Sequence, residues 1–272
     1  MAHILAESVT IDYPLTRSIS SKAARKNGGS DRLGANMVLK NGKPFLRAID
    51  NLSLEVHESG RLGIIGLNGS GKSTMLRALA GIFPPSSGRI RVEGEISSLL
   101  NVGLGTRSES TGRQNIYLRG YMRGMSKQQI REKEEEIIEF SELHEYIDMP
   151  VRNYSAGMGL RLSFAIATTL QPEVLLLDEW IGAGDQQFQQ KARQRMKDIF
   201  QNSGLAVICS HNVRLIESNC DQVIWLHRGK VVREGATFDV LPHYEEWRLA
   251  MQHGSEDARI EAPDRYLFDS SQ

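Results

Sequence analysis

A glycine-rich loop between two apolar segments constrains this 272-residue chain more than any other feature. Residues 61–65 predict a buried strand that leads into the loop, and residues 73–80 predict a helix that follows it. Glycines let backbone N–H groups turn inward around phosphate oxygens, and the helix N-terminus adds free N–H groups and a positive dipole end. The loop residues that match the G-x-x-x-x-G-K-[ST] pattern are Gly66, Leu67, Asn68, Gly69, Ser70, Gly71, Lys72, Ser73 and Thr74.

Two side chains of this loop have direct roles in nucleotide chemistry. Lys72 supplies a mobile positive charge for the β- and γ-phosphates, and the Ser73 hydroxyl can ligate Mg²⁺. The competing interpretation is a glycine-rich turn with a chance lysine, but the strand before the loop and the helix after it favour a nucleotide site. We therefore expect a nucleoside triphosphate and Mg²⁺ as ligands.

The composition excludes some classes of protein. Lys plus Arg and Asp plus Glu both number 33, so the net charge is zero and gives no global electrostatic reason to expect nucleic acid. The two cysteines, Cys209 and Cys220, fall in segments that we expect to be ordered, which suits a reducing compartment. The N-terminus lacks the order of a signal peptide, and no apolar run approaches the ~20 residues needed to cross a bilayer. We expect a chain that is soluble by itself and needs a partner for any membrane role.

Alternating strands and helices along the chain predict an α/β core with a parallel sheet. The continuous apolar run 173–178 suits a parallel strand that is covered on both faces. A mostly helical insert, about 104–171, interrupts this core, and within it Ser126 and Gln129 have the spacing of a capping box. Residues 8–13 alternate like an edge strand.

Two segments have no clear place in that core. Residues 15–47 have eight basic side chains and one acidic one, a net charge of +7. We weigh a solvated loop against a basic surface that faces anionic headgroups or a partner subunit. Residues 242–272 form a C-terminal extension beyond a domain that we place at 1–241. A frayed tail is the simpler interpretation, although Trp247, Tyr266 and Phe268 could dock on the body or on a partner.

Polar residues follow two of the predicted buried strands. Asp178 and Glu179 end the strand at 173–178, and His211 follows an apolar run at 205–209. In a phosphate-loop fold these strand ends lie beside the nucleotide, where Asp178 suits the Mg²⁺ shell and Glu179 suits activation of a water. An Asp-Glu pair after an apolar run is weak evidence by itself, but together with Lys72 it indicates hydrolysis.

The order of these motifs resembles that of ABC ATPases. Residues 154–158, Tyr-Ser-Ala-Gly-Met, are similar to the L-S-G-G-Q signature of that family, with Ser155 and Gly157 in the expected places. The order of phosphate loop, insert, signature, Asp-Glu pair and histidine also matches, across nearly all of 8–241. The resemblance implies a P-loop NTPase fold with a RecA-like parallel core, an antiparallel β subdomain and a helical subdomain.

The same resemblance implies how ATP is held. Two copies sandwich two ATP molecules, so Ser155, Ala156 and Gly157 of one copy face the γ-phosphate that the other copy binds. Tyr13 matches the aromatic residue that stacks on adenine, and Phe45 is the second candidate.

Three further positions take their roles from the family pattern. Asp185, after Gly184, matches the loop that crosses the dimer interface, and His211 matches the switch histidine. The family has a glutamine near residue 100, which this chain lacks. Asn101 lies there instead and could take part in the Mg²⁺ site with its shorter side chain.

The residues within these motifs indicate a particular group of ABC ATPases. Residues 111–116 (Thr-Gly-Arg-Gln-Asn-Ile) and 178–185 (Asp-Glu-Trp-Ile-Gly-Ala-Gly-Asp) look like those of ATP-binding subunits of polysaccharide exporters. This implies a subunit that pairs with a membrane-spanning permease at the cytoplasmic face of the bacterial inner membrane and powers export of lipid-linked O-antigen, capsule or a related glycan. Two other interpretations stay open: a soluble ABC ATPase that acts on nucleic acid or the ribosome, and a nucleotide-gated scaffold without turnover.

Overall fold

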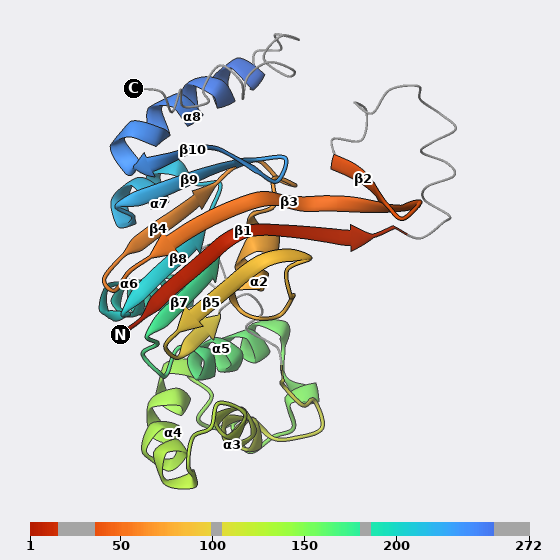
Figure 1. The fold of residues 1–272 in the computed structure, drawn as a ribbon. Coiled ribbons are helices and arrows are strands. Elements are labelled where there is room, and N and C mark those ends of the chain that lie inside the picture. Colours follow the sequence, from red (N-terminus) through yellow and green to blue (C-terminus); the bar gives the residue numbers. More distant parts are fainter. Residues whose placement is uncertain (16–35, 99–104, 180–185, 253–272) are drawn as a thin grey trace. The chain divides into compact units, whose positions relative to one another are not determined.

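A computed structural model describes residues 1–15, 36–98, 105–179 and 186–252 (Figure 1). The chain divides into two compact units. The first, which we call the sheet unit, comprises Met1–Ser97, Glu173–Glu179 and Gly204–Gln272. The second, which we call the helical unit, comprises Ser98–Pro172 and Trp180–Ser203. No helix in the described part of the chain is long and apolar enough to cross a membrane.

A mostly parallel sheet forms the core of the sheet unit, as the alternating pattern predicts. Its strand order is β10-β9-β4-β8-β7-β6. The strands are β4 (Arg61–Ile65), β6 (Ile96–Ser98), β7 (Val174–Asp178), β8 (Leu205–Cys209), β9 (Gln222–His227) and β10 (Lys230–Ala236). β4 pairs in parallel with β8 and β9, and β7 pairs in parallel with β8, whereas β10 runs antiparallel to β9. Every residue of β8 is buried, as expected for a strand covered on both faces.

The pairing register of this sheet aligns the ends of three strands. Ile64 of β4 pairs with Cys209 of β8, and Cys209 pairs with Asp178 of β7. Because all three strands are parallel, the residues that follow them leave the same edge of the sheet together. Helix α2 (Lys72–Leu79) follows β4 through the glycine-rich loop, and α7 (Val213–Asn219) follows β8.

An antiparallel sheet with the order β2-β3-β1-β5 completes the strands of this unit. The strands are β1 (His3–Pro14), β2 (Asn36–Lys40), β3 (Lys43–Val56) and β5 (Ser87–Glu93). The prediction of an edge strand at 8–13 is wrong, because β1 begins at His3 and lies between β3 and β5 (Figure 1). The register shifts between Ala6 and Val9, both of which are buried, and Ser8 between them has a φ of 49°. This bulge interrupts the alternation from which the strand was predicted.

The basic segment 15–47 is not one long loop. Its residues from 36 onward form β2 and the start of β3, joined by a tight turn in which Asn41 and Gly42 both have positive φ. Lys40 and Arg47 bind the buried Asp12 carboxylate, with N–O distances of 2.6 and 3.0 Å. Burial raises the pKa of Asp12, but hydrogen bonds from Arg47 and Lys40 outweigh it, so the net pKa is lowered. Residues 16–35, where most of the excess charge lies, are outside the described residues.

The helical unit contains α3 (Gly112–Met122), α4 (Lys127–Ser141), η2 (Val151–Asn153), α5 (Ala156–Ala167) and α6 (Gln186–Asn202). The capping box predicted from Ser126 and Gln129 is confirmed at the start of α4, and Thr111 with Gln114 forms another at the start of α3. The rings of Phe140, Phe164 and Phe188 pack against one another between α4, α5 and α6. These aromatic contacts form part of the hydrophobic core of the unit.

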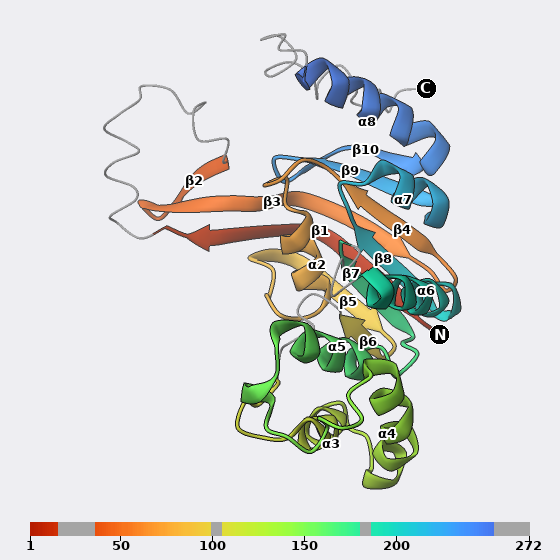
Figure 2. The same cartoon turned by 180° about the vertical axis from the view of Figure 1, so that it is seen from behind.

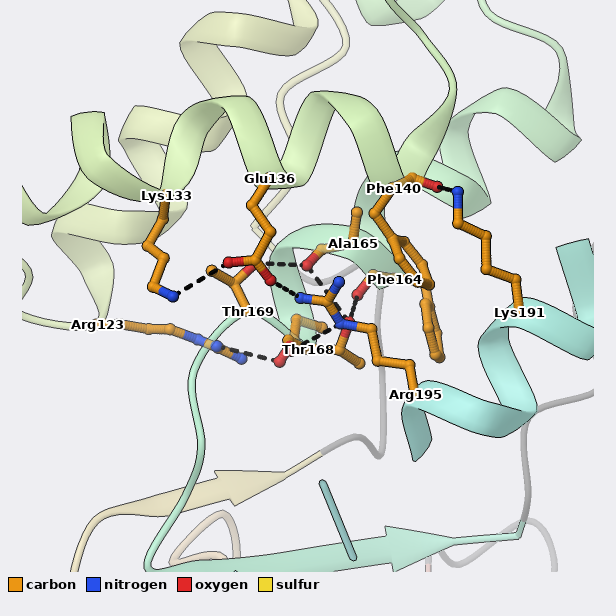
Figure 3. A network of polar contacts seen from close by, with 11 residues as sticks. Arg123, Lys133, Glu136, Phe140, Phe164, Ala165, Thr168, Thr169, Lys191 and Arg195 are labelled. Carbon is orange, nitrogen blue, oxygen red and sulfur yellow. Dashed lines mark hydrogen bonds and ion pairs between the residues drawn. The ribbon is translucent and has the colours of Figure 1, made fainter. Parts of the chain in front are cut away.

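Basic side chains bind the C-terminal carbonyls of α4 and α5 (Figure 3). From α6, Lys191 donates to the Phe140 carbonyl at 3.1 Å and Arg195 donates to the Thr168 carbonyl at 3.2 Å. Arg195 also pairs with Glu136 of α4. Cations at these positions satisfy carbonyls that have no partner within their own helix and oppose the negative dipole end. Through them, α6 is joined to both α4 and α5.

The C-terminal extension begins as an ordered helix, α8 (Thr237–Gln252), beside β9 and β10 (Figure 2). The prediction of a frayed tail is wrong for residues 242–252. Trp247 is 1% exposed and its ring lies 5.2 Å from that of Trp225 of β9, with Tyr244 packed against both. Burial of large aromatic rings holds this helix on the sheet. Tyr266 and Phe268 are outside the described residues.

Candidate functional site

The glycine-rich loop connects the buried strand β4 to helix α2, which begins at Lys72, one residue before the predicted start. Gly66 has a φ of 151°, and a Cβ there would lie 2.3 Å from the Leu226 carbonyl oxygen. Gly71 has a φ of 110°, and a Cβ there would lie 2.6 Å from the Ala48 carbonyl oxygen. Other residues at these two positions would be strained and would clash with backbone, so the tight loop requires glycine.

The Lys72 ammonium lies inside this loop. It donates to the carbonyl oxygens of Gly66 at 2.8 Å and Leu67 at 3.1 Å, and the residue is only 7% exposed. Burial lowers its pKa, while Cys209, Glu179 and Asp178 act in the opposite direction. Two neutral carbonyls compensate poorly for a buried positive charge. An anionic phosphate in the loop would compensate for it better.

Two other features prepare the loop for a ligand. The Ser70 hydroxyl is buried and has no hydrogen-bond partner among the residues that the structure describes. The turn between β9 and β10 is hydrogen-bonded to the loop: the Gly229 N–H donates to the Ser70 carbonyl at 2.8 Å. The Asp50 N–H donates to the Gly229 carbonyl at 2.8 Å, which ties the same turn to β3.

The strand ends place the acidic pair beside the loop. Asp178 ends β7, and Glu179 follows it with a φ of 63° and an N–H that donates to the Cys209 carbonyl at 2.8 Å. His211, just beyond β8, lies with its Nδ1 2.5 Å from Glu179 Oε1. A left-handed backbone conformation is unusual for glutamate, and here the bond to β8 holds it. The parallel register therefore brings Glu179 and His211 into direct contact.

A cavity of about 830 Å³ within the sheet unit joins these elements. Most of the predicted phosphate, magnesium and adenine residues line it: Tyr13, Asn68, Gly69, Ser70, Gly71, Lys72, Ser73, Thr74, Asp178 and Glu179. Gly66 lies beneath the loop, where its carbonyl binds Lys72, and His211 meets the site through Glu179. Phe45 is not among the lining residues, whereas the Tyr13 ring is, and it packs edge-on against Phe83.

The structure adds lining residues that sequence reasoning did not identify. Leu46, Arg47 and Ala48 come from β3, His227 is the last residue of β9, and Arg228 begins the turn after it. Burial lowers the pKa of His227, and Arg228 adds to this effect, so the imidazole is neutral near pH 7. The hairpin pattern indicated this turn, but no local signal placed it beside the phosphate loop.

The predicted signature residues lie in the helical unit. Ser155 caps α5, and its hydroxyl accepts a hydrogen bond from the Met158 N–H at 3.2 Å. Ala156 and Gly157 form the first turn of α5, where N–H groups lack partners within the helix. Among the described residues, a Cβ on Gly157 would meet only the Ser155 Oγ, at 3.8 Å, so none of them requires glycine there. Asn101, Gly184 and Asp185 are outside the described residues.

The fold and the cavity define a P-loop nucleotide-binding domain. Comparison with known structures agrees with this class of fold: the dimeric ATP-binding cassette MJ0796 bound to ADP and Pi aligns with a TM-score of 0.62 at 20% identity, over 86% of this chain and 98% of that one. An ATP-binding subunit of an ABC transporter aligns with a TM-score of 0.64 at 17% identity, over 96% and 99%. A family model described as ABC transporter matches residues 49–182.

Curated relatives share more sequence. The O-antigen export system ATP-binding protein RfbE of Yersinia enterocolitica is 38% identical over 245 residues, which cover 89% of this chain and 100% of that protein. RfbB of Myxococcus xanthus, another O-antigen export ATP-binding protein, is 40% identical over 74% of this chain and 46% of its own. The teichoic acids export ATP-binding protein TagH of Lactococcus lactis is 36% identical over 90% and 51%. The chain thus spans about half the length of the last two relatives.

The chain belongs to the ATP-binding proteins of ABC transporters, in the group that includes the O-antigen and teichoic acid export proteins. It is therefore an ABC ATPase, a member of a family of ATP-binding proteins. The fold class predicted from the motif order is confirmed, with a parallel core sheet and an antiparallel sheet in the sheet unit.

Replacing Lys72 with alanine tests the phosphate site directly. Lys72 lines the cavity and its ammonium would neutralise phosphate charge, so we expect Lys72→Ala to weaken ATP binding by at least about tenfold, or ~1.4 kcal/mol. Titration with a fluorescent ATP analogue would measure this. Lys127→Ala removes an exposed lysine of the helical unit and should bind ATP like the parent. Equal affinities in all three proteins would remove Lys72 from the phosphate site.

Proposed function

We propose that this chain is the ATP-hydrolysing subunit of a transporter that exports a lipid-linked cell-envelope glycan of the O-antigen or capsule type. The observation that supports this most strongly is the 38% identity that spans the whole of the Yersinia O-antigen export protein. The chain would act at the cytoplasmic face of the inner membrane, bound to a separate membrane-spanning permease that contacts the glycan.

The nucleotide in this proposal is ATP with Mg²⁺. The Ser73 hydroxyl and the Asp178 carboxylate line the same cavity as Lys72, and hard oxygen ligands of this kind suit Mg²⁺. The bound ion would offset phosphate charge, and Asn101 is proposed as a further contact. Tyr13 would stack on adenine at the end of the cavity where β1 and β3 meet, while Gly66 to Thr74 hold the phosphates.

Hydrolysis needs a residue that orients a water toward the γ-phosphate, and we assign Glu179 to this role. Its backbone is held against β8 by the bond to Cys209, and its carboxylate lies 2.5 Å from the His211 ring. A glutamate restrained at both ends has little freedom to turn away from the phosphate loop. His211 is thus proposed to hold Glu179 and to reach the γ-phosphate when ATP is bound.

The site is proposed to close only when two copies meet. Ser155, Ala156 and Gly157 would present the N-terminal N–H groups of α5 to the γ-phosphate in the partner copy, with Asp185 at the same interface. The free space at Gly157 supports this, because a close approach from another molecule gives a reason for a glycine that none of the described residues requires.

The Glu179→Gln variant tests the assignment of the water-activating residue. Glutamine keeps the shape of the side chain but not the basicity, so ATP should still bind while turnover falls by roughly 10²–10⁴-fold. Phosphate release and size-exclusion chromatography with ATP would show lost hydrolysis and a trapped dimer. Glu217→Gln, an exposed change on α7, is the control and should hydrolyse at the parent rate. A Glu179→Gln variant that hydrolyses ATP like the parent would refute the role.

The Gly157→Ala variant tests the proposed contact between copies. Alanine is favoured in helices, so the chain by itself should be as stable as the parent or more so, by up to about 1 kcal/mol. The added methyl group should nevertheless lower ATP turnover by at least about tenfold, ~1.4 kcal/mol of barrier. Gln128→Ala, an exposed change on α4, should keep its activity. Equal turnover in both variants would contradict a sandwich closed by Gly157.

Co-purification tests the transporter partner. A tagged chain should bring down a protein with several membrane spans from detergent-solubilised membranes of the source organism, as identified by mass spectrometry. The Lys72→Ala variant should retain this partner, since it alters the nucleotide site alone. Recovery of the chain without any membrane protein would argue against a transport role and would leave the ATPase assignment intact.

A further inference from the structure

Three side chains that could bind a metal gather on the antiparallel sheet, outside the nucleotide cavity. They are His3 of β1, Glu55 of β3 and His57 just after β3. One nitrogen or oxygen ligand atom from each lies within 4.8 Å of the other two. Neither the sequence motifs nor the proposed ATPase reaction uses these residues.

The backbone register brings the three together. β1 and β3 run antiparallel with Ile4 opposite Val56, so His57 falls directly across from His3. Glu55 lies two residues from His57, and side chains two apart share one face of a strand. The opposite face holds Ile4, Leu54 and Val56, all buried. Strand pairing therefore places the three residues next to one another on one face of the sheet.

The ligand atoms are close to the spacing that a metal requires. Tetrahedral bonds of about 2.0–2.1 Å to nitrogen place neighbouring ligand atoms about 3.3 Å apart. Glu55 Oε1 lies 2.9 Å from His3 Nε2 and 3.6 Å from His57 Nε2. The two imidazole rings are stacked, with centroids 5.1 Å apart, so one ring must turn for both nitrogens to face one ion. The His57 side chain is 75% exposed and is free to turn.

Glu55 differs from the neighbouring carboxylates on this face in its ion-pair partners. Two neighbouring carboxylates are neutralised by arginine: Glu7 pairs with Arg89, and Glu93, across from His3 on β5, pairs with Arg91. Among the described residues, the ion-pair partners of Glu55 are the two imidazoles and no lysine or arginine. Its negative charge is therefore available to a cation.

We propose that His3, Glu55 and His57 bind a divalent transition-metal ion, with Zn²⁺ as the best match. Two imidazoles and one carboxylate are ligands that Zn²⁺ accepts, whereas Mg²⁺ prefers oxygen ligands only. Water would fill the fourth position. The ion joins the start of β1 to the end of β3, about 30 Å along β1 from Tyr13 at a rise of ~3.3 Å per residue. It is thus separate from the Mg²⁺ of the nucleotide site.

Metal binding to the nucleotide-free, chelator-treated chain tests this site. Calorimetric titration should show about one Zn²⁺ per chain, and Co²⁺ should give visible absorption typical of a tetrahedral site. His57→Ala and Glu55→Gln should each weaken binding by more than about tenfold, because even the loss of an outer partner typically costs 10–100-fold. Zn²⁺ should raise the Tm of the parent but not that of His57→Ala. His144→Ala, which removes an exposed histidine of the helical unit, should bind Zn²⁺ like the parent.

Two controls keep the result interpretable. The His57 side chain is 75% exposed and the Glu55 side chain is 48% exposed. Both variants should therefore have the same Tm as the parent when no metal is present. His211→Ala separates this site from the nucleotide cavity and should leave Zn²⁺ binding unchanged. The proposal is overturned if the parent binds no Zn²⁺, or if His57→Ala and Glu55→Gln bind it as tightly as the parent does.

Discussion

The parallel pairing of β4, β8 and β7 is the constraint on which the nucleotide site depends. It sets Ile64, Cys209 and Asp178 in one row across the sheet. The loop after β4, the acidic pair after β7 and the histidine after β8 then leave the same edge side by side. A slip of one residue in the β7–β8 pairing would turn the side chains after β7 to the other face of the sheet and separate Glu179 from His211.

The phosphate loop surrounds the positive charge of Lys72, for which the neutral groups of the loop compensate poorly. Lys72 is buried with two carbonyl oxygens as partners, and the buried Ser70 hydroxyl has no partner in the described part of the chain. Both groups would gain from an anionic oxygen in the loop. The turn after β9 holds the loop from outside through Gly229, so the arrangement does not require the ligand to form it.

Local signals predicted part of this fold well, and long-range contacts account for the errors. The glycine pattern around Lys72, the capping box at Ser126 and the apolar strand 205–209 depend on neighbouring residues, and all three appear in the structure. The tail around Trp247 was expected to fray because its burial comes from Trp225, more than twenty residues away. β1 likewise turned out to be an inner strand because it pairs with β5, a contact between residues far apart in the sequence.

By itself, the sequence determined the chemistry of the site: a cradle of glycines, one lysine, a hydroxyl and a pair of carboxylates at the end of an apolar strand. These follow from residue types at short spacing, which local backbone geometry dictates. Only the tertiary structure decided which distant segments complete the site, such as the His227–Arg228 turn beside the loop, and which surface residues meet, as His3 and His57 do. Strand register sets those contacts, and it depends on the packing of the whole sheet and not on any one stretch of chain.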